Sequence, residues 1–438
     1  MIFNLPPILG LAPLVLYIIL AFQKNMHPIV NVGICVLLGA ILSGQSIGSL
    51  GTVVYESMGS FLALVGFIIM LGSGLGVVMR KTGVAENIVH LLMQKIGVKT
   101  QKRAILATMV SSIVLVTLLG TLAGANAIIA PIVIPLVAAV GLTPSTLAVI
   151  FQGAGQTGLF LSPFGPPMVT LMQITGLSYP RALLCAGLPV AVVMWIGTYI
   201  MAVRIQKQTQ GKEHFEDEAV EQPAIPDAPV QISKATVSAT LAFALVMLAM
   251  VVWGIATNGG AAFVILVMIA ASLITGVVGG MSPGKVIDAM MEGCGKMFWI
   301  FFMFLLFNPF LNFVTESGGF DALVDLVEPY ITVGGVVGFA IIVTFIGIFG
   351  INGAAVAQAM MIDTLFHPFL GDLGVSMSLW ATIVLVGSQI TSFAYPGLDM
   401  IGQMGLAHAK DIKPMMKLAY MAIIPGTLLV VIAECFIL

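Results

Sequence analysis

Three ionisable side chains stand in long apolar stretches, where they are the first candidates for chemistry. Asp399 ends the motif SFAYPGLD, and Asp363 lies one helical turn before His367. A charge at the centre of a bilayer costs roughly 2.5–3.5 kcal/mol, so each such group calls for an explanation. We predict that Asp399 binds or exchanges a proton or a cation, with Asp363 and His367 as the second candidates. The alternative for Asp363 and His367 is a mutually satisfied pair.

Neutral polar residues gather where Gly, Pro, Asn and Ser interrupt apolar sequence, at GTLAGANA (120–127), FLSPFGPP (160–167), GINGAA (350–355) and SFAYPGLD (392–399). Helix ends exposed at such breaks attract ions, and the side chains can hydrogen-bond without a net charge. For each polar side chain, a hydrogen bond between helices is the alternative. Na⁺ is a candidate ligand near Asn126, Asn352 and Asp399. The predicted substrate-binding residues are Gly124, Asn126, Gln156, Ser162, Pro163, Gly165, Asn352, Gly353, Ser388, Gln389 and Ser392.

Enzymatic chemistry is not indicated. The chain has no GxSxG, Walker or HExxH motif, and its four cysteines (Cys35, Cys185, Cys294 and Cys435) stand singly in apolar runs. Such cysteines are small core hydrophobes and not a disulfide scaffold or a zinc site. We therefore predict no catalytic activity, no metal centre of Cys or His ligands, and no cofactor other than Na⁺.

The elements that position these residues must be membrane helices. Of the 438 residues, 59% are hydrophobic and only 8% are charged, against roughly 25% in a soluble domain. The formal charge of -2 leaves no basic surplus for nucleic acid. The N-terminal apolar run has no signal-peptide pattern and is read as a retained span. Uninterrupted runs near 5–22, 28–44, 58–79, 182–203, 235–256, 261–279, 295–314 and 415–438 are long enough to cross a bilayer.

The chain contains an internal repeat. Pro135, Gly141, Gln156 and Pro163 recur 233 positions later as Pro368, Gly374, Gln389 and Pro396, in the same order. Glu56 and Glu292 also correspond, and we expect them to be interface or capping carboxylates. A repeat of this length favours two copies of one structural unit, here residues 1–205 and 235–438. The polar, Pro-containing segment 206–234 is predicted to link the copies.

Charge predicts that the two copies have opposite orientations. Segment 79–103 carries six cations against Glu86, whereas its counterpart 314–332 carries only carboxylates. By the positive-inside rule the first is cytoplasmic and the second is outside. In the next pair the sense reverses, because 176–184 has one cation and 409–417 has three. The linker is then cytoplasmic and both termini are extracytoplasmic.

Counting crossings completes the predicted fold. An odd number of crossings per copy requires that 104–140 and 333–369 enter and leave from one side as re-entrant hairpins. Broken helices at 144–175 and 375–408 follow them. We predict an all-α polytopic membrane protein with two inverted-topology repeats, about ten transmembrane helices, two re-entrant hairpins and two broken helices. No Arg or Lys falls in the middle of a span, so helix N-termini and neutral donors would have to hold an anion.

Three segments carry a family resemblance: LGSGLGVVMRKTGVAENIV (71–89), FLSPFGPP with TGLSYPRALLCAGLPVAV (within 160–192), and GSQITSFAYPGLDMIGQMGL (387–406). They resemble the ion transporter superfamily, most nearly gluconate permease and related carboxylate permeases, with Na⁺/H⁺ antiporters of the same clan nearby. The resemblance implies inverted repeats, a homodimer and elevator-like motion. Ser388, Ser392 and Asp399 match the permeases' polar run before an acidic residue, and Pro163 with Pro166 matches their Pro-rich break.

Two departures narrow the substrate that the resemblance implies. Phe164 replaces a His that often accompanies the Pro-rich break, and Leu398 stands where the permeases tend to have Asn. Both differences argue against a polyhydroxy acid such as gluconate. The sequence predicts a secondary active transporter of the inner membrane that moves a small organic anion, most simply a carboxylate, with H⁺ or Na⁺. A Na⁺/H⁺ antiporter without an organic substrate is the alternative.

Overall fold

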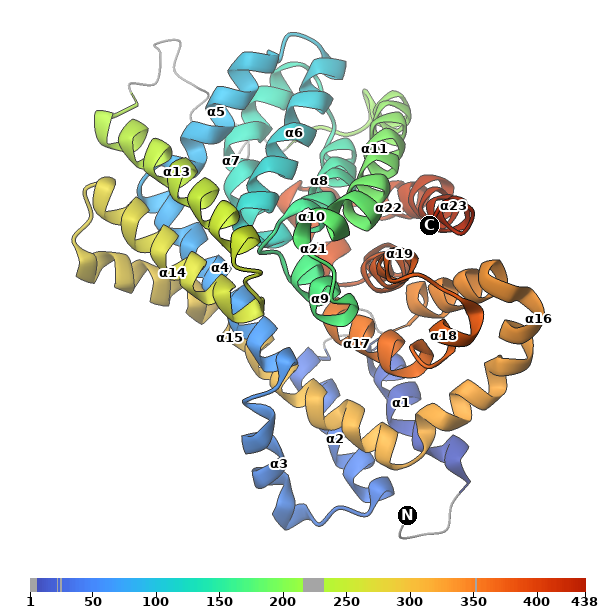
Figure 1. Ribbon diagram of the computed structural model, residues 1–438. Helices are drawn as coiled ribbons and strands as arrows, with labels where there is room; N and C mark the ends of the chain where they lie inside the picture. Colours follow the sequence, from blue (N-terminus) through green and yellow to red (C-terminus); the bar gives the residue numbers. More distant parts are fainter. Residues whose placement is uncertain (1–5, 22, 24–25, 216–231, 351–352) are drawn as a thin grey trace.

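The computed structural model describes residues 6–21, 23, 26–215, 232–350 and 353–438, and within these ranges the chain is helical without β-strands (Figure 1). The first half contains, in order, the 3₁₀ helix η1 (Pro7–Leu11), α1 (Ala12–Ala21), α2 (Pro28–Ser43), the 3₁₀ helix η2 (Ile47–Ser49), α3 (Leu50–Ser57), α4 (Phe61–Lys81), α5 (Val84–Ile96), α6 (Gln101–Leu119), α7 (Leu122–Ala139), α8 (Pro144–Leu161), α9 (Pro166–Thr175), α10 (Tyr179–Ala182), the π-helix η3 (Leu183–Gly187) and α11 (Leu188–Thr209).

The second half follows the same order. It contains α13 (Lys234–Ala256), α14 (Ala261–Val278), α15 (Pro283–Glu316), α16 (Gly319–Ile348), α17 (Ala355–Phe366), α18 (Phe369–Leu373), α19 (Met377–Gln389), α20 (Thr391–Ala394), α21 (Leu398–Leu406), α22 (Lys413–Leu418), the π-helix η4 (Ala419–Ile423) and α23 (Ile424–Glu434). By position, α15 corresponds to α3 and α4, α16 to α5 and α6, α19 with α20 to α8, and α21 to α9.

The helices are those of a polytopic membrane protein, as the sequence predicts. Within the described ranges, nine helical segments are long and apolar enough to cross a membrane. Their burial differs widely: only 17% of the apolar window of α13 is buried, against 94% for Met377–Ala394. Because an apolar helix that is not covered by protein must face lipid, α13 lies at the periphery, and α19 with α20 forms the core.

Helices α4 and α15 make the most extensive contact between two helices in the described part of the chain, and they run side by side in Figure 1. Glycines permit this approach. A Cβ on Gly293 would lie 2.4 Å from the Ser73 carbonyl oxygen, and one on Gly74 would lie 3.0 Å from the Met290 carbonyl oxygen. A side chain at either position would force the two helices apart, so Gly74 of α4 and Gly293 of α15 permit their close packing.

The π-helical turns η3 and η4 occupy equivalent places in the two halves. Each is followed by a proline at the second position of the next helix, Pro189 in α11 and Pro425 in α23. Proline has no N–H group, so the carbonyl four residues earlier loses its helical partner. At Cys185 the Thr382 hydroxyl replaces it, donating to the carbonyl oxygen at 3.1 Å. The wide turn therefore couples the last span of the first half to α19.

The linker begins later than the sequence predicts. We expected it from residue 206, but α11 continues to Thr209 and the following residues remain packed. Gln206 Oε1 accepts from the Thr143 backbone N–H at 3.0 Å, and Glu213 Oε2 accepts from the Ser145 N–H at 3.2 Å. A carboxylate is favourable at the positive N-terminus of α8. Polar residues 206–213 thus hold the start of α8, and the predicted linker residues 216–231 lie outside the described residues.

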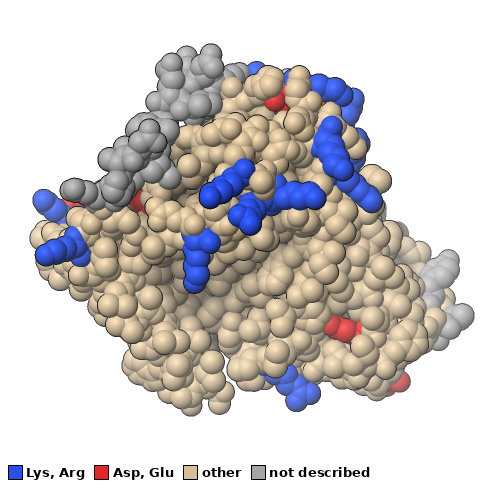
Figure 2. Space-filling model, turned by 90° about the horizontal axis from the view of Figure 1, so that it is seen from above, with Lys and Arg blue, Asp and Glu red and all other residues tan. Residues whose placement is uncertain are grey.

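The two ends of α15 bear opposite charge environments. Near its beginning, Glu292 contacts Arg80 and Lys81 at the end of α4, at 3.3 and 2.7 Å. At its other end, Glu316 accepts from Gln45 at 3.3 Å. These two points are 24 residues apart in one helix, or roughly 36 Å at 1.5 Å per residue. Figure 2 looks onto the upper face of Figure 1, where the α5–α6 turn lies, and Lys and Arg dominate it.

The inverted orientation of the halves stays a prediction that sided labelling can test. We expect Lys99→Cys to react with a membrane-impermeant maleimide from the cytoplasmic face only, and Glu316→Cys from the opposite face only, because α15 is longer than the bilayer is thick. The unsubstituted chain, with its four native cysteines, gives the background. Labelling of both positions from one face would rule out the inverted arrangement.

Candidate functional site

Asn126 is the polar centre of the first predicted hairpin. It lies in the second turn of α7, fully buried, and makes three hydrogen bonds. Its Oδ1 accepts from the Ser112 hydroxyl of α6 at 2.7 Å, and its Nδ2 donates to the Phe151 carbonyl of α8 at 3.2 Å. Nδ2 also donates to Gln403 Oε1 of α21 at 2.7 Å. One amide therefore joins the first half of the chain to the second broken helix.

The predicted hairpin tip is shorter than the motif GTLAGANA. The backbone is interrupted only between the end of α6 at Leu119 and the start of α7 at Leu122, so Gly124 and Asn126 are helical. Gly120 makes the turn with φ +64°, a conformation that glycine adopts without strain. The hydrogen bonds of Asn126 explain the difference, because an amide satisfied by three partners does not need to leave the helix.

A second contact crosses between the halves at the other break. Gln152 Nε2 of α8 donates to the Ser392 carbonyl in α20 at 3.4 Å. By the repeat offset, Gln152 corresponds to Leu385 and Asn126 to Ala359. Both counterparts are apolar, so the second half cannot return either contact. The side-chain hydrogen bonds at the centre therefore converge on α20 and α21, which carry the second break and Asp399.

Asp399 is the second residue of α21, one turn before Gln403. It is exposed, directly after a break in which α20 ends at Ala394 and α21 begins at Leu398. Residues separated by three and seven positions share a face of a helix, so Asp399 lies on the face of Gly402 and Leu406. Both of these line a cavity. Asp399 itself is not one of the wall residues, but it begins the helix that lines the cavity and that Asn126 holds in position.

This cavity, which we call the hairpin cavity, has a volume of about 360 Å³. It lies between the beginning of α7, the ends of α4 and α21, and the middle of α15. Its walls include Thr121, Ala123 and Gly124 at the positive end of α7, and two cations, Arg80 and Lys296. Thr121 makes no side-chain capping hydrogen bond to the helix. Exposed N–H groups at a helix start and nearby cations together favour an anion.

The two cations lie at the ends of apolar spans, in agreement with the prediction that no Arg or Lys falls in the middle of a span. The helix that carries Lys296 begins at Pro283 and not near residue 295, because a polar first section precedes its apolar run. Arg80 and Lys296 both contact Glu292 Oε1, at 3.3 and 3.1 Å. Glu292 therefore has the interface role expected for it, and it holds the cations at the wall of the cavity.

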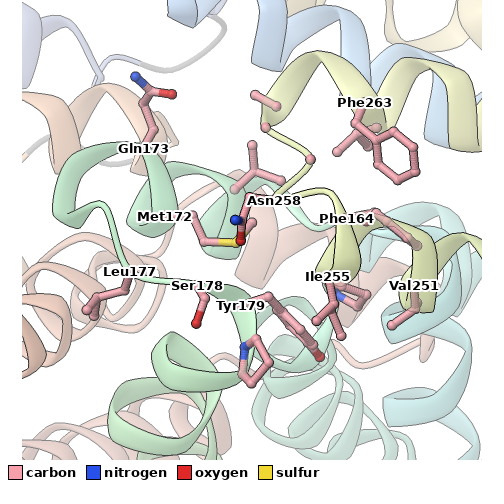
Figure 3. Close-up of a pocket in the computed structure, with 18 of the residues that line it drawn as sticks. Phe164, Met172, Gln173, Leu177, Ser178, Tyr179, Val251, Ile255, Asn258 and Phe263 are labelled. Carbon is pink, nitrogen blue, oxygen red and sulfur yellow. The ribbon is translucent and has the colours of Figure 1, made fainter.

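Two further cavities flank the breaks and are related by the repeat. The break-1 cavity, of about 340 Å³, lies between Pro163–Phe164 and the α13–α14 turn (Figure 3). The break-2 cavity, of about 580 Å³, lies between Tyr395–Ile401 and the α1–α2 region. Their walls match at the 233-residue offset: Pro163 with Pro396, Val251 with Ile18, Gly254 with Ala21, Ala261 with Pro28 and Val264 with Asn31. Each broken helix therefore faces the first two spans of the other half.

The remaining predicted substrate residues fall into three groups. Gln156 and Ser162 are buried, and Gln156 Oε1 and Ser162 Oγ have no hydrogen-bond partner among the described residues. The Ser388 hydroxyl donates to the Leu385 carbonyl within α19, the Ser392 hydroxyl of α20 donates to the Gln389 carbonyl at the end of α19, and Gln389 donates to Ser388. Pro163 lines the break-1 cavity, Gly353 lines the break-2 cavity, and Gly165 is the residue before the first turn of α9. Asn352 lies outside the described residues.

Asp363 and His367 form the satisfied pair that was the alternative reading. Asp363 Oδ1 contacts His367 Nδ1 at 2.8 Å and accepts from the Trp380 indole N–H at 2.9 Å. His367 is 47% exposed at its side chain. A carboxylate with two partners on α17 and α19 has a structural reason for its position. Asp399 is therefore the stronger candidate for ion coupling.

Sequence reasoning missed a further carboxylate and several amides. Glu434 near the end of α23 is 6% exposed, and its Oε2 has no hydrogen-bond partner in the described part of the chain. Glu434 is the only acidic residue of the final apolar run, 415–438, and this was the sequence signal that could have identified it. Gln152 and Gln403 could not have been found in this way, since their partners are hundreds of residues distant.

A resident metal centre is not formed by the described residues. Among them no group of three His, Cys, Asp or Glu side chains could hold a metal ion. Na⁺ can be bound by neutral oxygen ligands. Two buried amide oxygens on α8, Gln152 Oε1 and Gln156 Oε1, have no hydrogen-bond partner among the described residues.

Comparisons with known proteins support a membrane transporter. The sequence model described as the Na⁺/H⁺ antiporter family matches residues 3–178. No curated protein sequence matches the chain. Among solved structures, YdaH, a transporter of Alcanivorax borkumensis, aligns with a TM-score of 0.58 at 16% identity, covering 97% of this chain and 98% of its own. MtrF of Neisseria gonorrhoeae aligns with a TM-score of 0.53 at 16% identity, covering 95% and 96%.

These comparisons are less specific about the family than the sequence resemblance is. The two structures share its fold over nearly the whole length, so the all-α polytopic architecture is confirmed. The family match covers the first half, up to the loop after α9. A specific relation to gluconate permease is not confirmed.

The network around Asn126 generates a stability prediction. Asn126→Ala leaves the Ser112 hydroxyl and the Gln403 amide without a buried partner, at a cost of about 1–3 kcal/mol. Asn87→Ala is the matched control, because Asn87 makes one side-chain bond, to the Thr240 hydroxyl at 2.8 Å. We expect the melting temperature in detergent to fall further for Asn126→Ala. An equal or smaller fall would contradict the central role of this amide.

Proposed function

We propose that this protein is a secondary active transporter that moves a small organic anion, most simply a carboxylate, across the inner membrane with H⁺ or Na⁺. The observation that carries the proposal is the hairpin cavity. The beginning of α7, Arg80 and Lys296 face one space of about 360 Å³. That combination of helix N-terminus and cations suits a carboxylate.

Asp399 supplies a physical reason for coupling. It stands on the α21 face that lines the same cavity, so a bound carboxylate and the Asp399 carboxylate repel one another. A like charge nearby disfavours ionisation, and a proton or Na⁺ on Asp399 removes the repulsion. Anion and cation therefore each strengthen the binding of the other, which is the thermodynamic requirement for symport.

The transport cycle would use the paired cavities. Breaks in the two halves face the break-1 and break-2 cavities, whose walls match through the repeat. In an inverted arrangement these cavities approach the centre from opposite sides of the membrane. An elevator-like motion of the hairpins and broken helices, in a homodimer, agrees with the resemblance to the ion transporter superfamily.

A Na⁺/H⁺ antiporter without an organic substrate is the second candidate. It is favoured by the match of residues 3–178 to the Na⁺/H⁺ antiporter family. Proton movement reported by a dye when Na⁺ is added to proteoliposomes, with no carboxylate present, would support it. MtrF is one of a class of antimetabolite efflux pumps, so export of an organic solute is a further direction of transport to test.

A thermal-shift screen tests the proposed substrate class. We expect at least one small carboxylate to raise the melting temperature, and to raise it further with Na⁺ or at lower pH, because a ligand that binds the folded state stabilises it by mass action. Uncharged analogues of the same carboxylates are the control. Stabilisation by Na⁺ alone, with no carboxylate effective, would favour the antiporter.

Asp399→Asn tests coupling. The neutral amide removes the repulsion permanently, so we expect gradient-driven uptake to be lost while exchange of substrate across the membrane continues. Asp372→Asn, which changes an exposed carboxylate of α18, is the control and should transport normally. Full gradient-driven accumulation by Asp399→Asn would remove the proposed role.

The cavity cations give a third test. Lys296→Gln and Arg80→Gln should each raise the KM for the anion by about tenfold or more, since a charged hydrogen bond contributes about 1.5 kcal/mol or more. Lys285→Gln changes an exposed cation earlier in α15 and should leave the KM unchanged. A KM unaffected at both cavity positions would place the anion elsewhere.

A further inference from the structure

Two backbone carbonyls at equivalent breaks share an unexpected kind of partner. The Tyr179 hydroxyl donates to the Leu161 carbonyl at 2.8 Å, and the Tyr420 hydroxyl donates to the Ala394 carbonyl at 2.8 Å. Leu161 is the last residue of α8, and Ala394 is the last residue of α20. The two carbonyls are separated by 233 residues, the offset of the repeat.

The tyrosines themselves are not repeat counterparts. Tyr179 begins α10, and the offset would place its equivalent at Ile412, whereas Tyr420 lies inside η4. The equivalence therefore belongs to the acceptor and not to the donor. In each half, a tyrosine near the start of the last span bonds the equivalent carbonyl, but the two tyrosines stand at different positions of the repeat. Duplication of the sequence alone therefore does not explain the contact.

The chemistry of the breaks explains the need for an outside donor. The final carbonyls of a helix have no N–H partner within the helix. The N–H that would bond to Leu161 belongs to Gly165, which donates to the Ser162 carbonyl instead. Pro163 lies within the first break and Pro396 within the second, and proline has no backbone N–H to donate. An unpaired carbonyl at membrane depth costs several kcal/mol, and the phenol supplies the missing hydrogen bond.

A third tyrosine makes the same kind of bond at another helix end. The Tyr395 hydroxyl, from within the second break, donates to the Phe349 carbonyl at the end of α16 at 2.6 Å. Tyr179 also lines the break-1 cavity (Figure 3), and Tyr395 lines the break-2 cavity. Three of the chain's seven tyrosines thus bond the last carbonyls of helices that end at the centre.

We infer that Tyr179 and Tyr420 are positioning residues, which fix the direction of the two interrupted helices by holding their C-terminal carbonyls. Helix C-termini carry partial negative charge and attract cations. A fixed end presents its remaining carbonyls to a cation without first being ordered. The consequence for a transported cation rests on the proposed function, whereas the local order of the breaks does not.

Hydrogen–deuterium exchange on the full chain in detergent tests the local effect. Tyr179→Phe removes one hydroxyl and keeps the ring, so amides of 162–169 should exchange about fivefold faster while those of 395–401 are unchanged. Tyr420→Phe should produce the reverse pattern. Tyr199→Phe, in a half-buried tyrosine of α11, is the matched control and should change neither segment. Unchanged exchange at both breaks, or an equal increase throughout the chain, would overturn the inference.

Transport kinetics separate positioning from general structural support. In proteoliposomes, the apparent KM for Na⁺ or H⁺ should rise about fivefold in Tyr420→Phe, at the break that carries Asp399, and stay unchanged in Tyr179→Phe, while the maximal rate of both variants stays within twofold. Substitution by 4-aminophenylalanine keeps a donor at the same point of the ring and should restore the KM. A reduced maximal rate with an unchanged KM would show that the tyrosines only stabilise the fold. Localised exchange without any cation-dependent transport would keep the positioning role and reject the proposed function.

Discussion

The structure depends on the hydrogen bonds that helix ends must find when they stop inside an apolar layer. Lipid offers no donors or acceptors, so every interruption of a helix must be answered by protein or by a wet cavity. The described breaks are answered locally: tyrosine hydroxyls meet the carbonyls of Leu161, Ala394 and Phe349, and Gln358 donates to the Gly347 carbonyl. These bonds decide which helix ends remain open to a solute, and the start of α7 at the hairpin cavity is one of them.

Much of the fold could be predicted because breaks have a local chemical signature. Gly and Pro remove side chains and donors, so FLSPFGPP and SFAYPGLD predict the ends of α8 and α20 to within a few residues. Boundaries set by polar residues were harder to predict. The first section of α15 is helical and water-facing, and for this reason an apolar-run criterion began the helix near 295 instead of 283 and put Lys296 at its edge.

Contacts between distant segments were the part that sequence could not supply. Asn126 and Gln403 are 277 positions apart, and neither residue type predicts the other. The same holds for the tyrosines, because their acceptors are backbone carbonyls that any residue carries. Asn126 could be selected as a polar residue at a break, but its partners could be known only from the packing of α7 against α8 and α21. The candidate site was therefore predictable as a set of breaks and not as a network.

The differences between the two repeats matter most for the proposed function. Two identical halves would give the centre two equivalent cation sites, one for each break. Here Gln152 and Asn126 have the apolar counterparts Leu385 and Ala359, and Asp399 has the uncharged counterpart Pro166. All three differences place hydrogen bonds and charge on α20 and α21. On the proposed function, the second broken helix binds the coupling ion beside the anion, while the first serves as its neutral match. At an effective dielectric constant of about 20, two charges 4 Å apart interact by about 4 kcal/mol. One carboxylate on one of the two helices is therefore sufficient to make anion binding depend on a cation.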